Sequence, residues 1–332
     1  MRLANRCLGE GPVVVVIASA DTDETTIDAA RNVRDIVGRK RLRELMARRD
    51  GPGLVFLAGH VGLLGVTGAL LWMSLGTPWV VATTFLHGIV IVHFFAPFHE
   101  CTHYTAFKSR WLNTAVAWFT GLVLMLPPLV FRYAHADHHT YTQNIRRDPQ
   151  MIPMGETLPG YLYYASSIPY FISNLGALVN QTFGRLTEEE LRAVPESARS
   201  AVQREAVIFW AVYLGLAGIS LWLGTWAVVI YWLIPRFVGE PVMRIIRMSE
   251  HVGCARVPDM LQNSRTVEAS APVRWLAWNM PYHTAHHAAP QVPFHALPDL
   301  NAVLRDHTTD VRHGYIDAVR FQVRNAMSGG VA

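Results

Sequence analysis

Three clusters of histidines are the residues of this chain whose types and spacing could carry chemistry. They are His99-Glu100-Cys101-Thr102-His103, His135-Ala136-Asp137-His138-His139 and His283-Thr284-Ala285-His286-His287. A spacing of three or four residues places imidazole rings on one face of a helix. Eight of the 15 histidines therefore lie in three short segments, and in each segment the rings can converge on one point.

Converging imidazoles predict a metal site. Each neutral ring carries a lone pair that a cation can satisfy, and several protonated rings in one place would repel one another. Imidazole binds iron, zinc, copper and nickel, so the ligand type alone leaves the metal open. A zinc site has three or four protein ligands, and eight or more histidines therefore predict two metal ions. The alternative is that these histidines are solvated by lipid headgroups at a membrane surface.

Long apolar segments must position the clusters. The 332 residues are 51% hydrophobic and only 16% charged, and the mean hydropathy of +0.19 indicates apolar spans mixed with polar segments. A spanning helix needs about 20 apolar residues. The sequence predicts four spans, at about 54–75, 79–98, 206–223 and 226–246. Arg236, Glu240 and Arg244 make the last one partly polar, so we expect its second half to line the site or leave the bilayer.

Basic residues before the first span predict its orientation. Arg39, Lys40, Arg41, Arg43, Arg48 and Arg49 precede it, as is typical of a cytoplasmic flank. The second span then returns His99 to the same side. The apolar stretch 111–130 lies between two clusters that must share that side, so we expect an interfacial or re-entrant helix. The stretch 158–183 contains Pro159 and Pro169 and is also predicted to be interfacial.

We predict one membrane domain over residues 51–320, a polar cytoplasmic tail over 1–50 and a C-terminal tail over 321–332. The apolar run 13–18 is too short to span a bilayer; a cleaved signal peptide is the alternative for it. The three cysteines have no metal-type spacing. The net charge of +4 is assigned to membrane orientation, because no nucleic-acid-binding motif accompanies it.

The three motifs, in their order, resemble the membrane fatty-acid desaturase and hydroxylase superfamily, and most closely its acyl-lipid desaturases. They read HECTH at 99–103, HADHHTYTQ followed by Asp148-Pro149, and NMPYHTAHHAAPQVPFHALP from Asn279 to Pro298. The resemblance covers roughly residues 50–300. It implies an all-α, integral-membrane bundle of four transmembrane helices, with interfacial helices and a cytoplasmic histidine-rich cap.

The same resemblance implies a diiron site, and it adds His251 as a ligand at the cytoplasmic end of the last span. The implied metal ligands are His99, His103, His135, His138, His139, His251, His283, His286 and His287.

Carboxylates near these histidines are candidates to accept hydrogen bonds from the outward ring nitrogens. They are Glu100, Asp137, Asp148 and Glu250. For Asp148 and Glu250, ion pairs with Arg147 and Arg247 are the alternative. We expect Asn279 and His295 to support the third cluster, His60, His87 and His93 to pack or line a tunnel within spans, and His307 and His313 to lie at the surface.

The resemblance implies dioxygen as co-substrate and an external reduced electron carrier, for which we expect a ferredoxin, rubredoxin or cytochrome b5-type donor. An acyl chain is the expected substrate, because each methylene buried between the spans contributes about 0.8 kcal/mol. Basic residues near the clusters are candidates to hold an anionic headgroup or an acidic donor, with solvated positive charge as the alternative. They are Arg132, Arg146, Arg147, Arg244 and Arg256.

Desaturation of a fatty acid or lipid is the leading prediction. The first alternative is a hydroxylase or ketolase that acts on a lipid or carotenoid at the same type of site. The second is a histidine-lined metal transporter. Transporters place polar ligands near the middle of the membrane, whereas these clusters lie at the ends of predicted spans.

Overall fold

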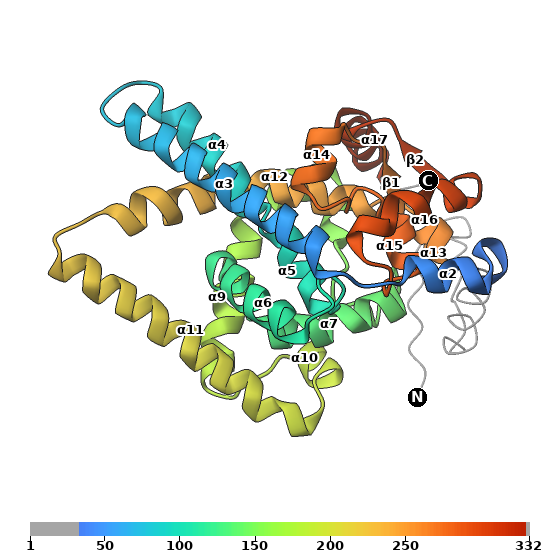
Figure 1. The fold of residues 1–332 in the computed structure, drawn as a ribbon, viewed down its shortest axis with the longest axis horizontal. Coiled ribbons are helices and arrows are strands. Elements are labelled where there is room, and N and C mark those ends of the chain that lie inside the picture. The colour runs from blue at the N-terminus through green and yellow to red at the C-terminus, as the bar shows by residue number, and fades with distance from the viewer. Residues whose placement is uncertain (1–32, 330–332) are drawn as a thin grey trace, which may run out of the picture.

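The computed structural model describes residues 33–329 and is mostly helical, with one two-stranded sheet (Figure 1). The helices of the first half are α2 (Arg39–Leu45), α3 (Asp50–Ser74), α4 (Val80–Val92), α5 (Phe95–Thr102), α6 (Arg110–Leu124), α7 (Pro128–Tyr141), the 3-10 helix η1 (Pro153–Glu156), α8 (Leu158–Ala165) and α9 (Ile168–Thr182).

The second half contains two long helices and several shorter elements. They are α10 (Glu188–Ala193), α11 (Glu196–Trp222), the π-helical turn η2 (Val229–Leu233), α12 (Ile234–His251), α13 (Met260–Asn263), β1 (Arg265–Val267), α14 (Ala271–Leu276), α15 (His283–Ala288), η3 (Phe294–Ala296), α16 (Leu297–Leu304), η4 (Arg305–His307), β2 (Asp310–Arg312) and α17 (Tyr315–Met327). The strands β1 and β2 pair in parallel.

Three helical segments among the described residues are long and apolar enough to cross a membrane. They are α3, the α4–α5 segment Val80–Thr102, and α11. In Figure 1, α3 and α4 form a hairpin that projects from the body, and α11 runs along another edge. Trp222 and Leu221, at the end of α11, are each 83% exposed. Apolar surface of this kind indicates a lipid environment, so the chain is a multi-pass membrane protein.

The predicted count of four spans is not reached by these helices alone. The helices α6 and α7 are long and apolar enough to cross a membrane only when they are taken together. They are bent by 97° relative to each other, so the pair is either a broken span or a re-entrant loop. The segment predicted to span at 226–246 instead contains η2 and the first part of α12. Because α12 carries Arg236, Glu240 and Arg244, it lacks the apolar composition of the other three segments. The crossing of α12 therefore stays a prediction.

Close packing of α12 against α4 sets the distance between two of the histidine-bearing segments. Gly88 on α4 faces the backbone of Pro235 and Gly239 on α12, and a side chain at Gly88 or Gly239 would collide with the opposite backbone. Glycine thus permits an approach that any larger residue would block. Since α4 leads into His99 and α12 ends at His251, this contact helps set the distance between the two helices that lead to those histidines.

A buried carboxylate from α11 stabilises the start of α7. Pro127 and Pro128 open this helix and offer neither a backbone donor nor a capping side chain. The backbone N–H of Leu129 donates instead to Glu205 Oε2 at 2.8 Å. A negative charge is also favourable at a helix N-terminus. Glu205 therefore holds the helix that carries the second histidine cluster.

Arg265 on β1 stabilises the opposite end of α12. Its side chain is fully buried and donates to the carbonyl oxygens of Ser249 and Val252 at 3.0 and 2.9 Å, on either side of His251. It also donates to Asp310 on β2 at 2.9 Å. The last carbonyls of a helix have no partner within it, and this arginine supplies one.

The predicted tails are partly structured. Val33, Val37 and Leu45 lie in the main apolar core with Trp278 and Phe294, so the described part of the predicted N-terminal tail packs on the body. The helix α17 crosses the predicted boundary at residue 320. The candidate signal segment at 13–18 lies outside the described residues.

Candidate metal centre

Four helices bring the nine predicted ligands together. The first cluster lies at the end of α5, the second on α7 and the third on α15, while His251 is the last residue of α12. Their ring nitrogens form two groups, and the ligand atoms within each group lie within 4.8 Å of one another. The first group contains His99, His103, His135, His139 and His286, and the second contains His138, His251, His283 and His287.

The Nε2 atoms face one another within each group. In the group of five, the Nε2 atoms of His99 and His135 are 2.7 Å apart, and His139 Nε2 lies 3.1 Å from those of His135 and His286. In the group of four, the Nε2 atoms of His251 and His283 are 2.9 Å apart. Lone pairs at such distances repel unless a proton or a cation lies between them. A metal ion in each group satisfies this arrangement.

Buried nitrogens without partners support the same conclusion. The Nε2 atoms of His103, His138 and His287 are buried and have no hydrogen-bond partner among the described residues. Buried polar atoms are normally paired. Each of these three atoms belongs to one of the two groups, so a metal ion fits the donor set that the chain provides.

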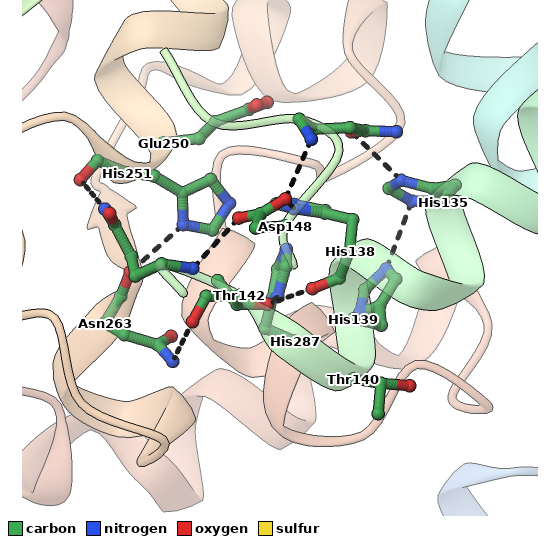
Figure 2. Close-up of polar contacts among 12 residues, drawn as sticks. His135, His138, His139, Thr140, Thr142, Asp148, Glu250, His251, Asn263 and His287 are labelled. Carbon is green, nitrogen blue, oxygen red and sulfur yellow. Dashed lines mark hydrogen bonds and ion pairs between the residues drawn. The ribbon is translucent and has the colours of Figure 1, made fainter. Parts of the chain in front are cut away.

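Three of the four outward Nδ1 atoms in the group of four, those of His138, His251 and His287, contact acceptors (Figure 2). His138 Nδ1 lies 2.8 Å from Asp148 Oδ1, and His251 Nδ1 lies 3.0 Å from the Asn263 carbonyl. The hydroxyl of Thr142 donates to the His138 carbonyl, so its oxygen accepts from His287 Nδ1 at 3.2 Å. A ring that donates from Nδ1 presents a lone pair at Nε2. These contacts fix the tautomer that binds a metal.

Glu100 and Gln150 face rings of the group of five. Gln150 Oε1 lies 3.2 Å from His135 Nδ1. Glu100 Oε1 lies 4.0 Å from the Nδ1 atoms of both His99 and His286. The other oxygen of Glu100 accepts from the Phe294 backbone N–H at 3.1 Å. Glu100 therefore connects the first cluster with the segment that follows the third.

Burial sets the charge state of the third cluster. Burial, reinforced by the neighbouring imidazoles, holds the pKa of His283, His286 and His287 well below the ordinary histidine value. These rings are thus neutral at pH 7 and can bind a metal. Burial alone would raise the pKa of Asp148, but His138 and two backbone N–H donors outweigh it and lower that pKa below its usual range.

The other candidate residues divide into those that reach the groups and those that do not. Asp148 contacts His138, whereas Arg147 stacks on Tyr141. Of the two alternatives for Asp148, the structure therefore has the histidine contact and not the ion pair with Arg147. Glu250 does pair with Arg247, at 2.5 Å, and also faces His283. Asp137 makes no hydrogen bond to a histidine in the described part of the chain.

Asn279 supports the segment after the third cluster, as expected, since its amide donates to the Phe294 carbonyl at 3.1 Å. His295 stacks edge-on with Phe294.

Several histidines and arginines outside the groups have local partners. His60 and His93 contact backbone carbonyls of α4, and His87 joins Thr67 to the Tyr231 carbonyl. Of the basic residues considered for an anionic partner, Arg132 donates to the Thr102 carbonyl, Arg244 pairs with Glu240 and Arg256 pairs with Glu156.

Thr142, Gln150 and Asn263 were missed by the sequence reasoning. Thr142 lies within the second motif, and Gln150 directly follows Asp148-Pro149. Their closeness in sequence to residues already singled out was the signal that could have identified them. Asn263 acts through its backbone carbonyl. No side-chain pattern indicates such a contact.

We expect Asp148→Asn to weaken metal binding by about 10- to 100-fold, because residues behind metal ligands have effects of that size. Both oxygens of Asp148 accept hydrogen bonds, from His138, Gln143 and Gln150. An amide would turn one acceptor into a donor that faces another donor. Competition with a chelator measures the affinity of the purified protein. Asp137→Asn is the matched control, and equal affinities for the two variants would contradict the assignment.

Comparison with known proteins gives a consistent result. A family model described as fatty acid desaturase matches residues 76–318, a range that contains all nine histidines. A protein of Picosynechococcus named sn-1 oleoyl-lipid 12-desaturase is 25% identical over 317 residues, which cover 82% of this chain and 87% of the relative. The Bacillus subtilis protein named fatty acid desaturase is 23% identical and covers 66% of this chain and 64% of the relative.

A protein of Drosophila melanogaster named sphingolipid delta(4)-desaturase is 21% identical, with 77% of this chain and 75% of the relative covered. The names of these three relatives share desaturation and differ in the lipid.

Proposed function

Because the chain belongs to the fatty acid desaturase family, we propose that it desaturates the acyl chain of a fatty acid or lipid at a diiron centre held by its nine clustered histidines. Members of this family are oxidoreductases, and this chain is one. The observation that carries the finer proposal is the division of nine buried or half-buried rings into groups of five and four, with their Nε2 atoms turned inward.

The reaction removes two hydrogens from neighbouring methylenes and balances as CH₂–CH₂ + O₂ + 2 e⁻ + 2 H⁺ → CH=CH + 2 H₂O. An iron pair would supply the redox chemistry with dioxygen that this step needs. The chain contributes ligand geometry: Asp148, Thr142 and the Asn263 carbonyl keep three rings in the tautomer whose Nε2 is free. Burial of the rings limits access of bulk water.

An aromatic wall beside the group of five supports an apolar substrate. Phe131 stacks on His135 with ring centroids 5.0 Å apart, and Phe95 lies 5.9 Å from His99. Both phenylalanines pack on the buried cluster of Phe94, Phe98 and Leu124. We propose that the acyl chain lies along this wall, which would place its methylenes next to His99 and His135. The names of the relatives support a lipid-linked or free acyl chain.

We propose that the electrons come from a separate ferredoxin, rubredoxin or cytochrome b5-type protein. An iron–sulfur cluster generally needs four thiolates, and this sequence has three cysteines.

The basic residues of α2 and of the segment before α3 support a cytoplasmic site, because such charges flank spans on the cytoplasmic side.

Lipid profiling tests this function. Cells that express the wild type and the His138→Ala, His139→Ala double variant are compared by mass spectrometry, with a donor protein co-expressed. We expect a lipid lighter by two hydrogens only with the wild type and only in the presence of oxygen. A product heavier by one oxygen would assign a hydroxylase or ketolase, and oxygen-independent metal uptake without a lipid product would assign a transporter.

A further inference from the structure

Arg247 is a buried arginine whose two terminal nitrogens contact residues behind different metal groups. Its Nη2 donates to Gln150 Oε1 at 2.7 Å, and its Nη1 donates to Glu250 Oε2 at 2.5 Å. Gln150 lies against His135 of the group of five, and Glu250 faces His283 of the group of four. The arginine side chain is 8% exposed. One guanidinium therefore connects Gln150, which contacts the group of five, with Glu250, which faces the group of four.

On the side of the group of five, Arg247 determines the orientation of the Gln150 amide. A guanidinium can only donate, so it requires the oxygen of Gln150 rather than its NH₂ group. The same oxygen lies 3.2 Å from His135 Nδ1. His135 must then carry its proton on Nδ1, which leaves the lone pair of Nε2 directed towards His99 and His139. Through one amide, Arg247 sets the tautomer of a ligand.

On the side of the group of four, Arg247 holds the Glu250 carboxylate. It binds Oε2, while Oε1 lies 3.8 Å from His283 Nδ1. This distance exceeds a direct hydrogen bond, so the contact is electrostatic. A carboxylate that can only accept favours a proton on Nδ1 of His283. The Nε2 atom of His283 then faces His251 with its lone pair.

We propose that Arg247 is a positioning residue that orients one ligand in each metal site and so makes both sites depend on the same side chain. This inference rests on the proposed function, because it assumes that both groups hold metal. The planar guanidinium suits the role, since it holds two N–H donors in one plane and points them in different directions. A lysine at this position would retain the charge but supply a single donor centre.

The test is a cobalt(II) titration of the full-length protein in detergent micelles, followed by optical absorbance with a chelator as competitor. Two variants assign the signals: His99→Ala with His103→Ala removes ligands from the group of five only, and His251→Ala with His283→Ala removes them from the group of four only. We expect Arg247→Met to weaken both sites by about 10- to 100-fold. Arg247→Lys should recover the affinity of one site only.

Two further variants test the contacts of Arg247 with Gln150 and with Glu250 separately. They also keep the test valid if Arg247→Met folds poorly. Gln150→Leu should weaken only the group of five. Glu250→Gln should weaken only the group of four, because its amide must turn its oxygen to Arg247 and its NH₂ to His283. Arg256→Met is the matched control, since Arg256 pairs with Glu156 on the surface and contacts neither group. Size-exclusion profiles and unfolding temperatures show whether each variant is folded.

The outcomes separate this inference from the proposed function. A wild type that binds fewer than two cobalt ions would overturn the proposed function. A wild type that binds two, beside an Arg247→Met protein in which either site keeps its full affinity, would overturn only the role of Arg247. Full recovery of both sites by Arg247→Lys would likewise refute the need for a planar two-donor group.

Discussion

Replacing both histidines of the first cluster, His99→Ala with His103→Ala, is expected to abolish product formation and to reduce the bound metal from two ions per chain to one. Both rings belong to the group of five, whereas His138, His251, His283 and His287 form the other group without them. The variant keeps three ligands in its damaged site and four in the intact one. In the proposed reaction both ions act together, so loss of one is expected to remove the activity entirely.

Metal content, measured by inductively coupled plasma mass spectrometry on anaerobically reconstituted protein, checks this expectation together with lipid profiling. The variant His60→Ala is the matched control, because His60 is a buried histidine that contacts the Val90 carbonyl and lies in neither group. It should keep both metal ions. Loss of both ions from the first-cluster variant would mean that the histidines form one joint site, and the division into two groups would be wrong.

The convergence of these histidines could be predicted because each cluster is local. Within an HxxxH or HxxHH segment the helical period alone brings the rings to one face, and no tertiary information is needed. His251 stands alone in the sequence, and only the family resemblance indicated it. How the rings are shared could not be predicted. His138 and His139 are neighbours in the second cluster, yet they belong to different groups because adjacent residues on a helix point in directions about 100° apart.

The residues that contact the outward nitrogens of these histidines were harder to predict than the histidine groups themselves. Asp148 was recognised, since a carboxylate close to a histidine cluster is an ordinary partner. Gln150 and the Asn263 carbonyl reach their histidines through chain folding that has no sequence pattern. Apolar length predicted α3, the α4–α5 segment and α11. The span predicted at 226–246 stays a prediction, because a π-helical turn precedes Pro235 there and α12 carries buried charged residues.

Those inward charges on α12 lead to the second large effect: Glu240→Gln is expected to lower the free energy of unfolding by about 3–5 kcal/mol. Glu240 is 1% exposed and pairs with Arg236 and, at 2.6 Å, with Arg244. Arg236 is also 1% exposed. Without the carboxylate, two buried guanidiniums would have no counter-charge. Their other contacts, with Tyr164, Tyr170 and the Leu124 carbonyl, are neutral.

Unfolding in mixed detergent micelles measures this loss. Glu156→Gln is the control, because Glu156 pairs with Arg256 at the surface and such pairs contribute about 0–1 kcal/mol. A second variant, Arg236→Met with Glu240→Leu and Arg244→Met, removes all three charges and should be far less damaging, since apolar replacement of a buried ionic cluster is often neutral or stabilising. If Glu240→Gln matched Glu156→Gln instead, the charges of α12 would be hydrated, and the helix would owe its position to uncharged packing, such as the glycine contact with α4, and to Arg265 at its end.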